Sequence, residues 1–226
     1  MKRLFLTVLT VGFLSVNAQA EQPGLRILSI GDSHSVGEFG IALDRQLRDH
    51  DSTRELSSYA SCSSKVSSWY SGFRTHCGWR RTVTTRNQAA RTAHGLLGRT
   101  PRFTNLLRRK SPDVTLVALG ANSLKASDPA NRDSMVRIIT DIQASGSECI
   151  WIGPPREPGR NEQALTNYYR LLHETIGNDC RIFDSRPFTQ FPRDGNRNIH
   201  LDAHGEAGRA IAREWAAAAA DFVRGV

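Results

Sequence analysis

Three side chains in this sequence are of the types needed for nucleophilic acyl transfer. Ser33 lies in the stretch GDSHS, Asn122 in GANS and His200 in NIHLDAHG. A serine hydrolase needs a hydroxyl nucleophile, an imidazole that takes its proton, and hydrogen-bond donors for the oxyanion. The Ser33 hydroxyl and a ring nitrogen of His200 could supply the first two. The Ser33 backbone N–H and the Asn122 amide could supply the donors.

Each of these residues also has a simpler structural explanation. A serine between a strand and a helix is usually a helix N-cap, and Asp32 or Ser35 could fill that position equally well. An asparagine after Gly-Ala is often a turn residue. A lone histidine in a polar loop is more often a surface residue than a base. The order and placement of the three residues along the chain, rather than any one of them, favour an active site.

The elements that must position these residues follow an alternating pattern. Short apolar, β-branched runs predict strands, with helical patterns between them. The predicted strands are Leu25–Ile30, Val114–Leu119, Ile150–Ile152 and Arg181–Phe183, with a weaker one near Glu55–Tyr59. The predicted helices are one containing Ile41, Leu43 and Leu47, and others at about Pro129–Ala144, Glu162–Ile176 and Gly205–Val223.

This alternation predicts a parallel sheet covered by helices on both faces. Gly146 and Gly177 follow two of the helices, where a left-handed cap is expected. In such sheets the ligand crevice lies beyond the carboxyl ends of the strands. Ser33 and Asn122 each follow a strand, and His200 precedes the last helix, so all three are expected at this crevice.

The three motifs, in this order, resemble those of the SGNH (GDSL-like) hydrolase superfamily. The resemblance runs from Leu25 to the C-terminal helix, which is nearly the whole chain after the N-terminal tract. It implies that Ser33 is the nucleophile, Asn122 an oxyanion-hole donor and His200 the general base. The implied fold is a flavodoxin-like three-layer α/β/α sandwich with a five-stranded parallel sheet, and the implied chemistry is cleavage or transfer of acyl esters without a metal or organic cofactor. The stretch GDSHS also resembles the opening of periplasmic SGNH modules that act on acylated glycans.

Two positions depart from the family pattern. The family usually places an aspartate three residues before the histidine, where it orients the imidazole, and here that residue is Arg197. Asp194 is the first candidate to replace it, and Asp202 or a backbone carbonyl are alternatives. His34 is expected to point away from the nucleophile, and His204 to be a helix N-terminal residue rather than a base.

The second departure concerns the loop after the second strand. The family usually places a glycine there, whose backbone N–H is another oxyanion donor. This chain has the run Ala-Ser-Cys-Ser at residues 60–63. Because a backbone N–H does not require glycine, we expect this loss to matter less than the missing aspartate.

The N-terminal tract has the pattern of an export signal. Residues 1–20 contain Lys2 and Arg3, an apolar stretch and an Ala-Gln-Ala end, which together predict cleavage after Ala20. We therefore expect a periplasmic or secreted protein without stable membrane insertion. Residues 21–226 are expected to form a single domain with a basic insertion at about 60–112.

Positive charge is concentrated in that insertion. The chain has a formal charge of +8, which falls to about +6 when Lys2 and Arg3 are removed. From Leu56 to Pro112 there is no acidic residue, and this segment contains Lys65, Arg74, Arg80, Arg81, Arg86, Arg91, Arg99, Arg102, Arg108, Arg109 and Lys110. Such a face favours an anionic envelope polymer or lipid headgroups as partner. Because the protein is expected to be exported, nucleic acid is not expected as a partner. The simpler alternative is that the basic residues are only solvated and bind no specific ligand.

Four cysteines in an exported chain predict two disulfides. Three pairings are possible. Cys62 and Cys77 bracket a short loop, while Cys149 and Cys180 each precede a predicted strand. We expect the pairs 62–77 and 149–180, the second of which requires neighbouring parallel strands.

These patterns favour a serine esterase that acts on an acylated cell-envelope glycan. A lipase-like or thioesterase-like acyl hydrolase would use the same residues, and would need a larger apolar channel. A glycan-binding or scaffold protein with a degenerate site is a third interpretation, and Arg197 is its best support. Trp69, Tyr70 and Trp79 could stack on sugars or cover the core beneath the insertion.

Overall fold

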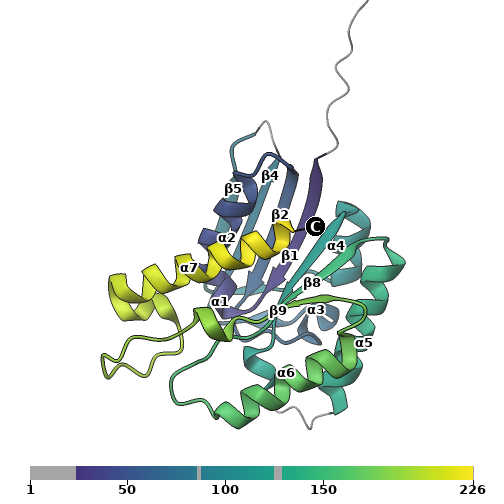
Figure 1. Cartoon of the computed structure of the whole chain (residues 1–226). Coiled ribbons are helices and arrows are strands. Elements are labelled where there is room, and N and C mark those ends of the chain that lie inside the picture. Colours follow the sequence, from purple (N-terminus) through teal and green to yellow (C-terminus); the bar gives the residue numbers. More distant parts are fainter. Residues whose placement is uncertain (1–23, 86–87, 125–128, 226) are drawn as a thin grey trace, which may run out of the picture.

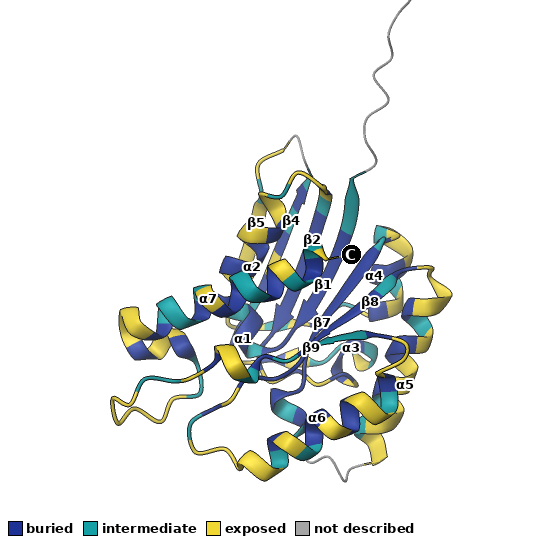
Figure 2. Ribbon diagram, viewed as in Figure 1, coloured by how far each residue is buried: buried dark blue, intermediate teal, exposed yellow. Residues whose placement is uncertain are grey.

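The computed structural model describes residues 24–85, 88–124 and 129–225, and the predicted export signal lies outside them. Within this part of the chain, a central sheet is covered by helices on both faces (Figure 1). The sheet forms the buried middle layer, and the outer faces of the helices are exposed (Figure 2). The predicted three-layer α/β/α sandwich is confirmed.

Five parallel strands form the centre of the sheet. β1 (Leu25–Gly31) lies between β2 (Thr53–Ser61) and β7 (Val114–Ala118). β8 (Glu148–Ile152) and β9 (Arg181–Phe183) extend the sheet beyond β7, also in parallel. All five were predicted, β2 only as a weaker candidate near Glu55–Tyr59.

The sheet has seven strands in the described residues, so the expectation of only five was wrong. β4 (Trp79–Thr85) pairs antiparallel with β2, and β5 (Arg91–Gly95) pairs antiparallel with β4. Both come from the basic insertion, which also forms a small second sheet of β3 (Arg74–Thr75) and β6 (Gly98–Arg99). β4 buries alternate residues, but these are Arg80, Thr82 and Thr84 rather than aliphatic side chains. Because these buried residues are polar, β4 does not show the apolar pattern from which strands are predicted.

Two groups of helices cover the two faces of the sheet. α2 (Glu38–Arg48) and α7 (Gly205–Arg224) pack on one face, with their apolar residues in one buried cluster. On the other face, α4 (Phe103–Lys110), α5 (Pro129–Ala144) and α6 (Glu162–Ile176) contribute to a second cluster. Two helices of one turn, α1 (Ser33–Val36) and α3 (Ser68–Ser71), follow β1 and β2. The 3-10 turns η1 (Ala121–Ser123), η2 (Arg186–Phe188) and η3 (Leu201–His204) lie in loops.

The helix ends agree closely with the sequence pattern. α5 and α6 begin and end at the predicted residues. Gly146 beyond α5 has φ +74°, the left-handed conformation expected of a cap. Gly177 beyond α6 has φ −62°, so the left-handed cap predicted there was wrong.

Both expected disulfides are present. Cys62 is bonded to Cys77, and Cys149 to Cys180. The second bond joins β8 to the residue before β9, and these strands are parallel neighbours as that pairing required. In the described residues, no helix is both long and apolar enough to cross a membrane.

Candidate active site

Three loops leave the sheet together at the carboxyl ends of its central strands. Gly31 at the end of β1 is paired with Ala60 on β2 and with Ala118 on β7. The segments that follow these strands therefore start side by side, as expected at the crevice of a parallel sheet. They contain Ser33 and Asn122, two of the predicted site residues.

Ser33 is the first residue of α1, and Asp32 is the N-cap of this helix. The Asp32 carboxylate accepts a hydrogen bond of 3.1 Å from the His34 N–H. Gly31 is required here, because a Cβ would lie 2.1 Å from Ser35 Oγ. Asp32 therefore takes the capping role that Ser33 could have filled. The Ser33 hydroxyl has no hydrogen-bond partner among the described residues.

Asn122 ties the other two loops to β1. Its Nδ2 donates a hydrogen bond of 3.1 Å to the Ser64 carbonyl, and Ser64 Oγ donates one of 3.3 Å to the Gly31 carbonyl. An amide group has two N–H donors, so one remains for an oxyanion. Gly120 has φ +144°, and a Cβ there would lie 2.7 Å from the Tyr168 ring. Only glycine fits this turn, which carries Asn122.

The loop after β2 takes a turn that usually requires glycine. Ser63 has φ +63°, in the left-handed region that disfavours residues with a Cβ. Ser63 follows Cys62, whose disulfide to Cys77 fixes the loop. The absence of glycine from this loop therefore does not prevent the left-handed conformation.

His200 lies beside the loop that follows β1. Its ring centroid is 5.4 Å from that of His34, the residue after Ser33. His200 Nε2 is buried and has no hydrogen-bond partner among the described residues, so it is not bonded to Ser33 here. Burial lowers the pKa of His200, and the positive charge of His34 lowers it further, against the opposing effect of Asp202 and Glu157. The imidazole is thus held in its neutral, proton-accepting form.

The structure does not pair Asp194 with His200. Asp194 Oδ2 lies 2.9 Å from His204 Nδ1, and Asp194 Oδ1 accepts a hydrogen bond from the Asn196 N–H. The ring of His204 is buried at the start of α7, and its Nε2 lies 2.8 Å from the Asn198 carbonyl. These bonds fix the loop that carries His200. Arg197, at the family's aspartate position, is exposed.

A buried ion pair that was not predicted lies beside His200. His34 Nε2 is 2.7 Å from Glu157 Oε1, with side chains 5% and 1% exposed. Burial alone would lower the pKa of His34, but the hydrogen bond to Glu157 and the charges of Asp32 and Glu157 outweigh it and raise the pKa. Glu157 also forms an ion pair with Arg160. Glu157 follows β8 in the stretch GPPREPG, and this position at a strand's carboxyl end was the available sequence signal.

Two further carboxylates act on this cluster. Burial raises the pKa of Asp32 to about 6, although the positive charge of His34 and the backbone hydrogen bonds from His34 and Ala121 oppose the shift. The Asp202 carboxylate lies against Gly37, where a Cβ would be 3.3 Å from Asp202 Oδ2. Its charge raises the pKa values of both His34 and His200. Asp202 therefore acts on His200 electrostatically, whereas Asp194 is bonded elsewhere.

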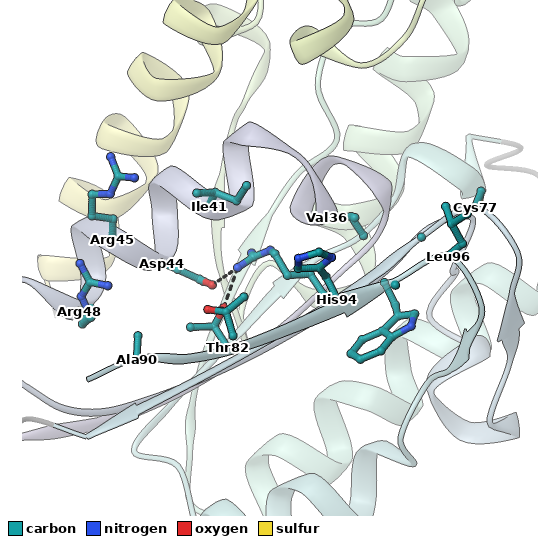
Figure 3. Close-up of a pocket in the computed structure, with 15 residues that line it drawn as sticks. Val36, Ile41, Asp44, Arg45, Arg48, Cys77, Thr82, Ala90, His94 and Leu96 are labelled. Atoms are coloured by element: carbon teal, nitrogen blue, oxygen red, sulfur yellow. Dashed lines mark hydrogen bonds and ion pairs between the residues drawn. The ribbon is translucent and has the colours of Figure 1, made fainter. Parts of the chain in front are cut away.

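A groove of about 600 Å³ runs between α2 and the strands β4 and β5 (Figure 3). Val36 of α1, Cys77 and Leu96 line one end, and Arg48 and Ala90 line the other. Val36 is three residues after Ser33, and residues three apart lie on neighbouring positions of a helix surface. The groove thus begins beside the segment that carries Ser33. The basic side chains that line it are Arg45, Arg48, Arg80 and His94.

Comparisons with known proteins support the fold. No protein-family model matches the chain, and no curated protein matches it in sequence. Among solved structures, it is similar to a catalytic mutant of Axe2, an acetylxylan esterase from Geobacillus stearothermophilus, with 12% identity, 89% of this chain and 93% of that chain covered, and a TM-score of 0.56. It is also similar to the psychrotrophic esterase EstA from Pseudoalteromonas sp., with 12% identity, coverage of 88% and 98%, and a TM-score of 0.54.

A third similar structure is a GDSL-like lipase from Bacteroides thetaiotaomicron, with 10% identity, 88% of each chain covered and a TM-score of 0.50. These likenesses span most of each chain. The chain therefore has the fold of the GDSL-like, or SGNH, hydrolases, as the motifs GDS, GANS and the late histidine predicted.

Proposed function

We propose that this protein is a serine acyl hydrolase with Ser33 as its nucleophile. The observation that carries the proposal is that the Ser33 hydroxyl has no hydrogen-bond partner among the described residues. This hydroxyl is free because Asp32 caps the helix, and it stands at the edge of the sheet where Asn122 also lies. The unpartnered Nε2 of the neighbouring His200 supports the proposal, because a buried ring nitrogen without a partner is unfavourable unless a ligand or nucleophile completes it.

The reaction would proceed through an acyl-enzyme. Ser33 Oγ attacks the ester carbonyl while His200 takes the hydroxyl proton. The second Asn122 N–H and the Ser33 backbone N–H stabilise the oxyanion. The alcohol leaves with the proton from His200. Water, or a sugar hydroxyl in a transfer reaction, then attacks the acyl-enzyme and restores the free serine.

The charges around His200 would take over part of the role of the missing aspartate. Asp202 acts on His200 through its charge, and the ion pair of His34 and Glu157 lies against the ring. In the usual triad, a carboxylate orients the histidine and stabilises its protonated form. Here burial, with the positive charge of His34, lowers the pKa of His200, which favours proton acceptance but weakens stabilisation of the imidazolium. We therefore expect slower catalysis than in an enzyme with the aspartate.

We propose an acylated, anionic cell-envelope glycan as the substrate. The groove beside α1 supports this, because Arg45 and Arg48 line it, and its wall from β4 and β5 belongs to a segment without acidic residues. The one carboxylate in the lining, Asp44, is paired with Arg80. Sugar rings pack on apolar surface while arginines bind carboxylates, and Val36 and Ile41 supply such surface. The acetylxylan esterase with the same fold is consistent with a carbohydrate ester.

The test is a comparison of the chain with its Ser33→Ala variant on two substrates. Acetate release from O-acetylated peptidoglycan and hydrolysis of a short-chain aryl ester would both be measured. We expect Ser33→Ala to lose at least about a thousandfold in rate on both, because the nucleophile is removed. The matched control is Ser71→Ala, an exposed serine of α3, which should keep full activity.

Equal inactivity of the unmodified chain and Ser33→Ala on both substrates would refute the hydrolase. Retained binding of the polymer in that case would favour a glycan-binding protein with a degenerate site. Activity on the aryl ester but not on the glycan would keep the hydrolase and reject the proposed substrate.

A further inference from the structure

Two adjacent leucines on the turn between β5 and β6 are exposed to solvent. Leu96 is 72% exposed and Leu97 is 70% exposed. Both are flanked by glycines in the stretch Gly-Leu-Leu-Gly at residues 95–98. Single exposed apolar residues need no explanation, but an adjacent pair at a turn tip marks a candidate contact surface.

The turn is held rigidly by its backbone rather than by its leucine side chains. The Leu96 carbonyl accepts a hydrogen bond of 3.1 Å from the Gly78 N–H, and the Leu97 carbonyl accepts one of 2.8 Å from Trp79 Nε1. A Cβ at Gly98 would lie 2.4 Å from the Trp79 indole, so the turn wraps closely over that ring. The leucine side chains are therefore presented outward without contributing to the core.

Arginines surround this turn without carboxylate partners. Arg74 and Arg99 are paired across β3 and β6, and both are exposed. Like charges directly opposite on paired strands destabilise a sheet, so this pair is unfavourable unless an anion lies between them. Exposed Arg81 adds a third charge, lining the same hollow as Gly98 and Arg99. None of the three arginines forms an ion pair within the part of the chain that the structure describes.

The turn lies at the same edge of the sheet as Ser33. Ser61 at the end of β2 is paired with Trp79, and Trp79 is paired with Gly95. Gly31 and Ala60 mark the same edge on β1 and β2. Three strand spacings, roughly 14 Å, separate β1 from β5. If the two leucines dock on a flat surface, that surface would therefore lie opposite the edge of the sheet that carries Ser33.

We propose that Leu96 and Leu97 dock the protein on an anionic phospholipid surface, with the arginines of β3, β4 and β6 against the headgroups. Shallow insertion of apolar side chains combined with cationic attraction is the usual mode of peripheral membrane binding. Two leucines present far less area than the roughly 800 Å² per partner of a stable protein interface. An anionic membrane supplies an apolar layer for the two leucines and negative charge for the surrounding arginines.

The test is sedimentation of the chain from residue 21 onward with vesicles, without any activity measurement. Vesicles of phosphatidylglycerol and phosphatidylethanolamine would be compared with phosphatidylcholine vesicles. We expect binding to the anionic vesicles, with about a tenfold or greater loss of partitioning in the double variant L96S/L97S. The variant R74Q/R99Q should lose affinity for anionic vesicles and become less sensitive to lipid charge, with Arg81 still present.

The matched control is Val136→Ser on α5, a residue 49% exposed, which should bind as the unmodified chain does. Circular dichroism and thermal unfolding would show that L96S/L97S remains folded. Three results would overturn the proposal: no binding to anionic vesicles, unchanged binding by L96S/L97S, or a dimer of the unmodified chain that L96S/L97S abolishes. Because vesicle binding does not depend on Ser33, its failure is distinguishable from failure of the hydrolase proposal.

Discussion

The side chains of His34 and Glu157 are buried against each other, and the hydrogen bond to Glu157 favours the protonated, positive form of His34. Removing two charges from water is costly, and their attraction offsets this cost only when other hydrogen bonds satisfy them. Glu157 has that support from Arg160, and the backbone N–H of His34 is bonded to Asp32. A buried pair is weak evidence for stability, so its place against the His200 ring suggests a role in setting the ionisation of His200.

We predict that His34→Gln shifts the pH dependence of activity. The positive His34 lowers the pKa of His200, so its removal raises that pKa. In the proposed mechanism only neutral His200 accepts the Ser33 proton, so activity should be lost at a higher pH as the solution is acidified. This is measured by the pH profile of kcat/KM on an aryl ester, in which the acidic limb should shift to higher pH.

The control for this variant is His173→Gln, an exposed histidine on α6. Its acidic limb should coincide with that of the unmodified chain. An acidic limb that stays in place in His34→Gln, with only a lower plateau, would mean that His34 supports the fold and does not tune His200.

The site shows what sequence spacing can and cannot predict about single residues. Ser33, Asn122 and His200 could be chosen as candidate site residues because each follows a strand or precedes the last helix. The partner of Asp194 was not predictable, since His200 and His204 are four residues apart and the loop's course decides which one reaches the carboxylate. Glu157 was missed because its partner His34 is 123 positions away.

At the scale of elements, one arginine joins the inserted strand to the segment that carries Ser33. Arg80 of β4 donates to the Ser35 carbonyl through Nε at 3.2 Å and Nη2 at 2.8 Å. Its Nη1 forms a buried ion pair with Asp44 of α2 and donates to Thr82 at 2.9 Å. The inserted strand thus fixes the C-terminal end of α1.

We predict that Arg80→Met destabilises the protein by about 3–5 kcal/mol, because Asp44 is left as a buried charge without its partner. The double variant R80M/D44L should recover most of this loss, since no charge then remains buried. Urea unfolding of the two variants and of the unmodified chain measures the difference. Equal stability of both variants would show that the lost bonds to Ser35, rather than the stranded charge, account for the effect.

The elements themselves were predicted unevenly, for a physical reason. Parallel strands buried on both faces are apolar runs, and β1, β7 and β8 could be recognised as such. β4 and β5 extend the sheet with threonines, arginines and a histidine, whose polar atoms are satisfied by long-range partners such as Asp44. No local pattern contains that information, so no strand was predicted within the basic insertion.

At the scale of the whole molecule, the inserted strands of the basic segment lie at one edge of the sheet. β4 and β5 form one end of the strand order, with β9 at the other. Arg132 and Arg170, on α5 and α6, are both in ion pairs with Glu174, whereas Arg45 beside the groove forms none with a described residue. Under the proposed function, the positive potential beside the groove would attract the anionic glycan to it over about one Debye length.

We predict that kcat/KM on an anionic O-acetylated glycan falls about tenfold between low salt and roughly 0.5 M salt, where screening is nearly complete. Hydrolysis of an uncharged aryl ester should change little, because its approach does not depend on the field. The variant R45Q/R48Q should show a flatter salt dependence on the glycan. R132Q/R170Q removes the same net charge from α5 and α6 and should retain the salt dependence of the unmodified chain. If both double variants flatten it equally, the net charge of the protein, and not the groove, draws in the polymer.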